Sequence, residues 1–370
     1  DLLNLRFTVS VPAPSIRCYR ISTHAGRLSE QATRKVLFGE VIETPEYTLE
    51  LDEGGIRTLR KGSACWFCRE QGALFAGVID EKSAVSHGSW SVASRGSLIE
   101  AEYLGHIGTI GIQFTMTLAG RRIDCRVKFI HHGEKIGSAA QPESFKDNQN
   151  GFVHEDKLRF LLPLQLGEAF GVRDLPFLVE ETDDRYIQGN YWTACGDGRI
   201  GIACFNRGSM CMVREQEGVS IPLEYANDYV WGSRALYGEI EHEFALLPYQ
   251  GDWKMQDLHR AALAYAYPLA AYPVASDQKG VWRKEIAFLQ VKGSENVLLS
   301  ALYPEGDSII VRVYEVEGKD GSVMISSPFA TVEEEVNLLG EPMGDYRDAF
   351  PIKAHKIHSF RMRKGGDSCG

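Results

Sequence analysis

Hydrophobic residues recur at every second position along most of this chain. Residues 110–118 (IGIQFTMTL) and 123–129 (IDCRVKF) both alternate apolar side chains with polar or charged ones. Residues 47–51 (YTLEL) repeat the pattern. Successive side chains of a strand leave on opposite faces, so this period predicts half-buried antiparallel strands. The residues 119–121 between the two longer runs are short enough for a hairpin.

Turn-forming residues separate the alternating segments. Asp, Gly and Pro gather at residues 52–55 (DEGG), 196–198 (GDG), 304–307 (PEGD) and 318–321 (GKDG). Helical patterning is scarce, and its best instance is Met255–Tyr265, with Leu258, Ala262 and Tyr265 on one face. Many strands with turns at such intervals predict large β-sandwiches.

Two polar stretches organise the chain. Residues 130–152 read as a long loop inside a domain, because strand patterning resumes on both sides. Residues 271–284 follow the only clear helix and precede a new run of strands, and they read as an interdomain linker. We therefore expect an all-β protein: a leading strand segment at 1–34, a large β-sandwich at 35–275 and a small one at 285–363.

Composition and charge narrow the class of protein. The chain has 370 residues and a formal net charge of -10, without a basic stripe, so nucleic acid is not an expected partner. No apolar run reaches the length of a membrane span, and no membrane partner is expected.

The eight cysteines are irregularly spaced, mostly within apolar strand-like runs, and are expected to be buried thiols. The single CxxC, at Cys65 and Cys68, lacks the second pair of a zinc ribbon and the helix of a redox motif, which favours a structural role. The sequence contains no Asn-x-Ser/Thr sequon, and its first residues show no signal peptide. Together these features favour a cytoplasmic location.

One stretch, GEIEHEFALLPYQGDW (residues 238–253), concentrates ionisable residues. With period two, Glu241 and Glu243 share a face and lie roughly 6.5–7 Å apart. His242 takes the opposite face, and Pro248 is expected to end the strand. That carboxylate spacing would suit a glycosidase if a sugar cleft lay between them, but a charged strand face is the commoner explanation.

We take the cleft or sugar-binding candidates from this stretch. They are Glu241, His242, Glu243, Asp252 and Trp253. Tryptophan rings can stack on sugars, although core packing is the more frequent role of any one of them. No catalytic residue and no metal ligand is assigned, because the histidines are scattered and no nucleophile elbow or phosphate-binding glycine loop occurs.

The same stretch resembles the G-E-H-E-F-x-Y-A-L-x-P-H-x-G-x-W segment of family 38 glycoside hydrolases, the retaining α-mannosidases. Tyr249 stands where that family usually has histidine. Other segments resemble the family in the same order along the chain: 120–129 (GRRIDCRVKF), 154–164 (HEDKLRFLLPL), 173–180 (RDLPFLVE), 189–208 (GNYWTACGDGRIGIACFNRG), 296–318 (NVLLSALYPEGDSIIVRVYEVEG) and 350–363 (FPIKAHKIHSFRMR).

The resemblance is to the C-terminal half of that family. It implies a galactose-mutarotase-like super-sandwich followed by a small β-sandwich. It also places zinc, or another divalent metal, and the aspartate nucleophile in an N-terminal barrel that this chain does not contain. His154-Glu155-Asp156 does not match the family's metal-binding H-x-D-x-x-W context, so the resemblance implies no cofactor in this chain.

The resulting hypothesis is a mostly structural region that completes the substrate cleft of a retaining α-mannosidase and is inactive alone. Its expected partners are the N-terminal catalytic half of the parent enzyme and a mannose-containing carbohydrate, with homo-oligomerisation left open. Two alternatives stay open. One is a stand-alone carbohydrate-binding module. The other is a mutarotase-like enzyme that uses Glu241, His242 and Glu243 for acid–base chemistry.

Overall fold

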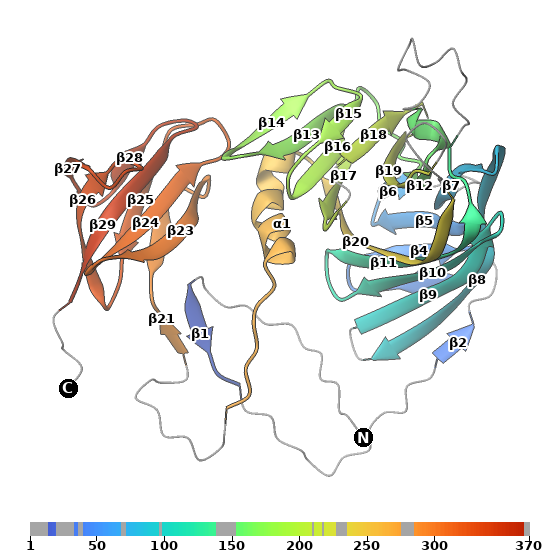
Figure 1. The fold of residues 1–370 in the computed structure, drawn as a ribbon, viewed down its shortest axis with the longest axis horizontal. Helices are drawn as coiled ribbons and strands as arrows, with labels where there is room; N and C mark the ends of the chain where they lie inside the picture. The colour runs from blue at the N-terminus through green and yellow to red at the C-terminus, as the bar shows by residue number, and fades with distance from the viewer. Residues whose placement is uncertain are drawn as a thin grey trace. The chain divides into compact units, whose positions relative to one another are not determined.

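Two compact units make up the chain in the computed structural model (Figure 1). The large unit comprises Leu28–Asp174 and Glu181–Leu269, and the small unit comprises Asp1–Arg27, Leu175–Glu180 and Ala270–Gly370. The segment Leu175–Glu180, which lies within the range expected for the large sandwich, thus groups with the small unit. The structure describes residues 14–19, 33–35, 40–67, 72–95, 98–137, 153–208, 211–216, 218–226, 235–274 and 285–365.

Two antiparallel sheets form the large unit. The first contains, in spatial order, β2 (Thr33–Lys35), β8 (Lys82–Arg95), β9 (Leu98–Ile107), β10 (Ile110–Leu118), β11 (Ile123–Glu134), β20 (Leu236–Gln250), β17 (Ile200–Asn206), β16 (Trp192–Gly196) and β13 (Phe170–Leu175). The second contains β3 (Val41–Glu43), β4 (Thr48–Leu51), β5 (Gly55–Lys61), β7 (Ala73–Ile79), β12 (Leu158–Leu162), β19 (Gly218–Glu224), β18 (Cys211–Glu215) and β15 (Tyr186–Gln188), with β6 (Ala64–Phe67) also paired to β5. Strand β8 pairs with β7 as well as β9, so it carries the chain from one sheet to the other.

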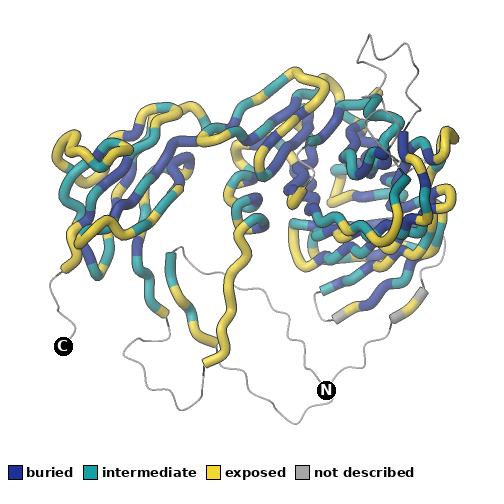
Figure 2. The backbone as a smooth tube through the Cα atoms, viewed as in Figure 1, coloured by how far each residue is buried: buried dark blue, intermediate teal, exposed yellow. Residues whose placement is uncertain are grey.

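An aromatic cluster joins the inner faces of these two sheets. Phe75 and Phe160 come from the second sheet, whereas Phe114, Phe129 and Phe244 come from the first. Ring centroids of neighbouring members lie 4.9–5.8 Å apart. All five residues are at most 2% exposed, and burial of this kind is the main stabilisation of a sandwich. Figure 2 colours the backbone by burial, with buried residues in dark blue.

The expected hairpin and helix are both present. Strands β10 and β11 pair in register from Leu118↔Ile123 to Gly111↔Ile130. The short 3-10 helix η4 (Trp253–Gln256) precedes α1 (Leu258–Ala266). The two helices are separate because Asp257 between them has a left-handed φ of 54°. A further 3-10 turn, η3, spans His154–Asp156. The apolar face predicted for the helix is buried. Within the described ranges, no helix has the length and apolarity needed to cross a bilayer.

Two expected boundaries are wrong. Strand β11 runs on to Glu134, so 130–134 are strand and not loop. Strand β20 continues past Pro248 to Gln250. Its pairing with β11 stops at Leu246, so the missing N–H of Pro248 breaks no bond on that edge. The carbonyl of Pro248 on the same edge is 3.4 Å from the Tyr47 hydroxyl, which donates at 2.5 Å to the Arg121 carbonyl.

The cysteines largely follow the sequence expectation. Cys125, Cys195 and Cys204 are buried free thiols, and burial raises the pKa of each. Cys18, which is free, is exposed. Cys65 is disulfide-bonded, so the expectation of a free thiol is wrong there; Cys68 and Cys369 lie outside the described residues.

The small unit is a second β-sandwich, as expected. Its larger sheet has the order β23 (Val297–Glu305), β24 (Ser308–Glu315), β29 (Ile357–Lys364), β26 (Ala330–Val336) and β27 (Pro342–Asp345). The smaller sheet has the order β22 (Gln290–Gly293), β25 (Gly321–Ser326) and β28 (Phe350–Ile352). Strands β1 (Ser15–Arg17) and β21 (Glu285–Ala287) form a separate pair. Strand β14 (Leu178–Thr182) begins within the Leu175–Glu180 segment. The core contains Val311, Val313, Val323, Phe360 and Met362.

Two buried tyrosines test how much the Tyr47 bond matters. Tyr47 and Tyr249 are both 3% exposed, but the Tyr249 hydroxyl has no hydrogen-bond partner among the residues that the structure describes. We expect Tyr47→Phe to lower the free energy of unfolding by about 1–2 kcal/mol, because the Arg121 carbonyl loses its donor. Tyr249→Phe is the matched control and should be neutral or stabilising. Urea denaturation followed by tryptophan fluorescence measures both. Equal losses in the two variants would contradict this role of the Tyr47 hydroxyl.

Candidate functional site

The predicted glutamates lie on the solvent-facing side of strand β20. In the antiparallel register with β11, Glu243 faces Arg126 and Glu241 faces Lys128. Opposite residues in such a pair have close side chains, so an acidic row on β20 meets a basic row on β11. The sequence pattern correctly places Glu241 and Glu243 side by side on one face. It does not identify the basic row of β11 that lies opposite them.

These charges pair with one another. Arg126 is 3.0 Å from a Glu241 oxygen and 2.6 Å from a Glu243 oxygen, and Lys128 is 2.9 Å from Glu239. The side chains of Glu241 and Glu243 are 43% and 30% exposed. The face can therefore meet polar groups of a ligand or partner. Glu243 is not poised as a general acid, because the neighbouring cations favour its ionised form.

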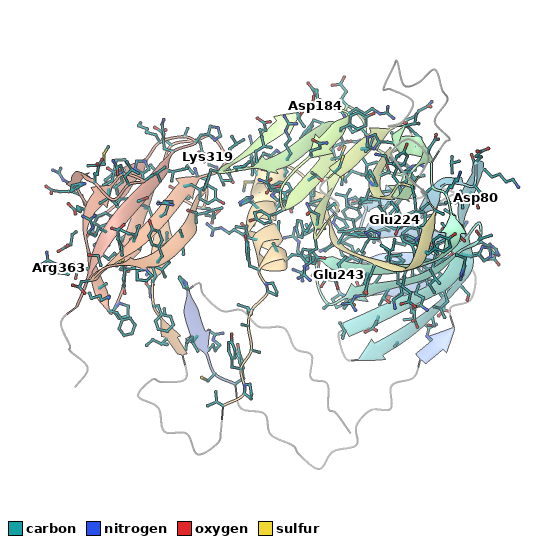
Figure 3. All side chains as sticks on the ribbon, in the orientation of Figure 1. Asp80, Asp184, Glu224, Glu243, Lys319 and Arg363 are labelled. Atoms are coloured by element: carbon teal, nitrogen blue, oxygen red, sulfur yellow. The ribbon has the colours of Figure 1, made fainter. Side chains whose placement is uncertain are left out.

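Glu243 is the most firmly held member of this row. A second guanidinium, that of Arg207, donates to it at 2.8 Å. Arg207 also lies 4.5 Å from the Tyr265 ring centroid and donates to the Tyr265 carbonyl at 2.8 Å. Partial burial raises the pKa of Glu243, but hydrogen bonds and charge from Arg126 and Arg207 outweigh burial and lower that pKa. Glu243 is labelled in Figure 3.

His242 points to the opposite side of β20, into the space between the two sheets. Its Nε2 lies 2.9 Å from a carboxylate oxygen of Glu224 at the end of β19. The other Glu224 oxygen lies 2.9 Å from His131 Nε2. Glu224 is labelled in Figure 3. The three candidates Glu241, His242 and Glu243 are thus not brought together, since a different carboxylate faces the histidine.

Sequence reasoning missed this buried cluster for two reasons. The loop predicted at 130–152 includes His131. In the structure His131 instead continues the alternation of strand β11 and lies on the same buried face as Val127 and Phe129. Extending that period by one residue pair would have identified it as a buried histidine. Glu224 gives no comparable signal, because its contact with β20 depends on the packing of two sheets.

Asp252 and Trp253 have structural surroundings. The Asp252 carboxylate accepts the Lys254 backbone N–H at 2.9 Å and caps η4. The Trp253 side chain is 5% exposed, and its indole N–H donates to Glu181 at 2.8 Å. A ring this buried offers no face for sugar stacking.

The other described tryptophans behave in the same way. Trp66, Trp90 and Trp192 are at most 4% exposed. Their indole N–H groups donate to the Gly201 carbonyl, the Asp52 carbonyl and His259 Nδ1, at 2.8–3.0 Å. Trp231 and Trp282 lie outside the described residues. Core packing is therefore the role of every tryptophan that the structure describes.

Carboxylates within the family-like segments organise turns. Asp174 is 1% exposed and accepts the backbone N–H groups of Tyr191 and Trp192 at 2.9–3.0 Å, which ties the segment at 173–180 to that at 189–208. In the small unit, Glu315 is fully buried and accepts backbone N–H groups from Glu317, Gly318 and His355 at 2.6–2.9 Å. These contacts explain acidic residues at those positions without catalysis.

The described residues do not fit a metal ion. Among them, no group of three or more His, Cys, Asp or Glu side chains is arranged to hold one. The nitrogens and oxygens of His131, His242 and Glu224 face one another at 2.9 Å instead of sharing a common centre. No chemical step through a metal is therefore derived for this chain.

The comparisons with known proteins agree with this architecture. Residues 296–360 match the family model described as the glycosyl hydrolases family 38 C-terminal beta sandwich domain. The resemblance to family 38 drawn from the sequence is thereby confirmed over that segment. No curated protein matches the chain in sequence.

Two solved structures share the fold over most of the chain. An alpha-mannosidase from Enterococcus faecalis V583 is similar with a TM-score of 0.68 and 11% identity, covering 90% of this chain and 43% of that one. A protein in the glycosyl hydrolase family 38 from Enterococcus faecalis has a TM-score of 0.68 and 12% identity, covering 90% and 45%. A galactose mutarotase related enzyme from Lactobacillus acidophilus scores 0.29 at 9% identity, covering 58% and 98%. The chain spans less than half the length of the two Enterococcus proteins. The all-β fold class expected from the sequence is confirmed.

The charged face leads to a prediction about stability. We expect Glu243→Gln to lower the free energy of unfolding by about 0.5–1 kcal/mol at pH 7, because two guanidinium groups each lose a carboxylate partner. Glu239→Gln is the control and should cost less than about 0.3 kcal/mol, because its carboxylate is 61% exposed and, within the described part of the chain, pairs with Lys128 alone.

The pH dependence of that difference follows from the lowered pKa of Glu243. Its stabilisation is complete above the ordinary value of 4.5 and is lost as the pH falls through the lowered value in the folded protein. The two variants should therefore converge in acid. Urea midpoints at pH 7 and about pH 3 measure this. A gap between the variants that persisted unchanged at the lower pH would contradict the ionic origin.

Proposed function

We propose that this chain is the C-terminal β region of a retaining α-mannosidase of the family 38 type. In this proposal the hydrolysis of α-mannosides takes place on a part of the protein outside these residues. The chain described here stabilises that part and completes the substrate cleft. It has no catalytic residue or cofactor of its own.

The observation that carries the proposal is the extent of the fold match. Ninety per cent of this chain matches less than half the length of an alpha-mannosidase from Enterococcus faecalis V583. The family match at 296–360 supports the same assignment for the small unit. The surroundings of the candidate residues are compatible with a supporting role, because Asp252 and Trp253 maintain the fold.

Within that role, the charged face of β20 is the most suitable surface for contacting polar groups. Glu241 is 43% and Arg126 is 62% exposed, and both carry hydrogen-bonding groups that can recognise sugar hydroxyls or a neighbouring domain. We therefore infer that Glu241 and Glu243 contribute to the cleft of the complete enzyme by binding and orientation. Proton transfer is not part of the role of Glu243, because Arg126 and Arg207 lower its pKa and keep it ionised.

Neither alternative function has a comparable observation behind it. A stand-alone carbohydrate-binding module that stacks sugars on tryptophan would need an exposed indole ring, and the described tryptophans are buried. A mutarotase-like enzyme would need Glu241, His242 and Glu243 to converge, and His242 lies on the other face of the strand from both glutamates.

Purification of this chain alone and of the product of its complete reading frame tests the proposal. The chain alone should neither hydrolyse an aryl α-mannoside nor retain zinc stoichiometrically after dialysis. The complete product should cleave the same substrate with retention of configuration. Turnover by this chain that survives metal removal would contradict the proposal, as would a complete product that is inactive with added divalent metal.

The role of the charged face is tested in the complete enzyme. Glu241→Gln should raise KM with kcat little changed, because the interaction lost is one of binding. Glu305→Gln in the small unit is the control and should leave both constants unchanged. An equal fall in kcat and kcat/KM for Glu241→Gln would instead indicate a contribution made only in the transition state.

A further inference from the structure

The charged row on the solvent-facing side of β20 has a tyrosine at its first end. Tyr237 lies opposite His132 in the β11–β20 register, and residues opposite one another in an antiparallel pair share a face. Along β11, His132 shares that face with Lys128 and Arg126, because every second side chain leaves on the same side. Tyr237 is 73% exposed, so its ring stands on the same surface as the salt bridges.

The Tyr237 ring rests against the neighbouring strand. Gly133 on β11 has a φ of 116° and no side chain. A Cβ atom at Gly133 would fall 2.9 Å from the Tyr237 hydroxyl oxygen and 3.0 Å from two carbons of its ring. The ring is thus supported by the β11 backbone while most of its surface faces solvent. An aromatic ring that is already supported loses little rotamer freedom when a ligand stacks on it.

Helix α1 and a second tyrosine lie at the other end of the row. The Arg207 guanidinium donates to Glu243 and to the Tyr265 carbonyl, at 2.8 Å in both cases. Two residues after Tyr265, Tyr267 is 62% exposed. Its ring centroid lies 5.6 Å from that of Tyr191, and the two hydroxyl groups share a hydrogen bond. An exposed aromatic ring with a supporting neighbour therefore adjoins the Glu243 end.

The row between these tyrosines is balanced in charge. Within the described residues, three carboxylates meet three cations, namely Glu239, Glu241 and Glu243 with Lys128, Arg126 and Arg207. A balanced row does not attract a charged ligand from a distance. It also differs from the core of a protein interface, where charged residues are depleted. A neutral ligand rich in hydroxyl groups fits both facts, because carboxylates accept hydrogen bonds and guanidinium groups donate them.

The length of the row indicates how large that ligand is. Tyr237 and Glu243 are six residues apart on one strand, which corresponds to roughly 20 Å. A single sugar ring is shorter than this. A chain of sugars can place its apolar C–H faces on the aromatic rings at the two ends and its hydroxyl groups against the charged side chains between them.

We propose that the surface from Tyr237 along Glu241 and Glu243 to Tyr267, the tyrosine-flanked strip, binds a neutral oligosaccharide. The inference rests on the proposed function, in which the substrate is an α-mannoside, and it adds that several sugar units are recognised instead of one. Tyrosine supplies the stacking surface that the buried tryptophans do not. Glu241 and Arg126 are 43% and 62% exposed, so they keep hydrogen-bonding capacity toward the ligand while paired with each other.

Titration calorimetry of this chain with mannose and with an α-linked mannotetraose gives the direct test. The tetrasaccharide should bind on the order of tenfold more tightly, because only the longer ligand reaches both tyrosines. Equal affinity for the two sugars overturns the proposal. So does the absence of heat with either sugar at millimolar concentration, which is the result expected if another part of the parent protein covers this face.

Tyrosine variants locate the binding. Tyr237→Ala and Tyr267→Ala should each weaken mannotetraose binding about tenfold, whereas Tyr237→Phe keeps the ring and should retain most of the affinity. Tyr186→Ala is the matched control, since Tyr186 is 38% exposed on β15 of the second sheet. Unchanged binding by Tyr237→Ala, or an equal loss in Tyr186→Ala, overturns the assignment. Circular dichroism melts of all four variants verify that each is folded.

Binding to this chain alone does not depend on hydrolysis, which separates the two proposals. An inactive complete product would contradict the α-mannosidase assignment, and mannotetraose binding that is lost in Tyr237→Ala would still support the tyrosine-flanked strip. An active complete product, together with a chain that binds no mannotetraose, would overturn the strip and leave the assignment in place.

Discussion

The backbone hydrogen bonds of strand β20 fix the layout of the large unit. Its first part pairs with β11 and its last part with β17, and the two ladders overlap at Phe244–Leu246. A strand held on both edges cannot slip, and a slip of one residue would exchange its two faces. This register is what keeps Glu241 and Glu243 in solvent while His242 enters the space between the sheets.

Buried carboxylates recur throughout the structure with one physical task. Asp174, Glu134 and Glu315 each accept at least one backbone N–H, and Asp197, which is 2% exposed, accepts those of Gly167, Arg199 and Ile200. Such bonds satisfy backbone donors where a turn leaves the ladder, and they make a buried anion tolerable. Asp174, Asp197 and Glu315 lie in segments that resemble family 38, and their role in connecting strands accounts for an acidic residue at each of these positions.

Local patterning was sufficient to predict the strands, their faces and the β10–β11 hairpin, because side-chain period and turn chemistry are properties of short segments. It failed at Pro248, where proline is tolerated because the pairing of β20 with β11 stops at Leu246, two residues earlier. It also failed to link His242 with Glu224, which lies 18 positions away on another sheet. The resemblance identified the two sandwiches, but it could not separate residues that hold turns from residues that face a ligand.

The ring of Tyr249 has an evolutionary consequence for its neighbours. It lies opposite Gly201 in the β17–β20 register, and a Cβ atom at Gly201 would fall 2.3 Å from its hydroxyl oxygen. A Cβ at Gly196 would fall 2.7 Å from the same oxygen. Positions 196, 201 and 249 therefore form one steric unit. Descendants of this sequence that acquire a side chain at either glycine must also shrink or reorient the residue at 249, and the three positions should co-vary.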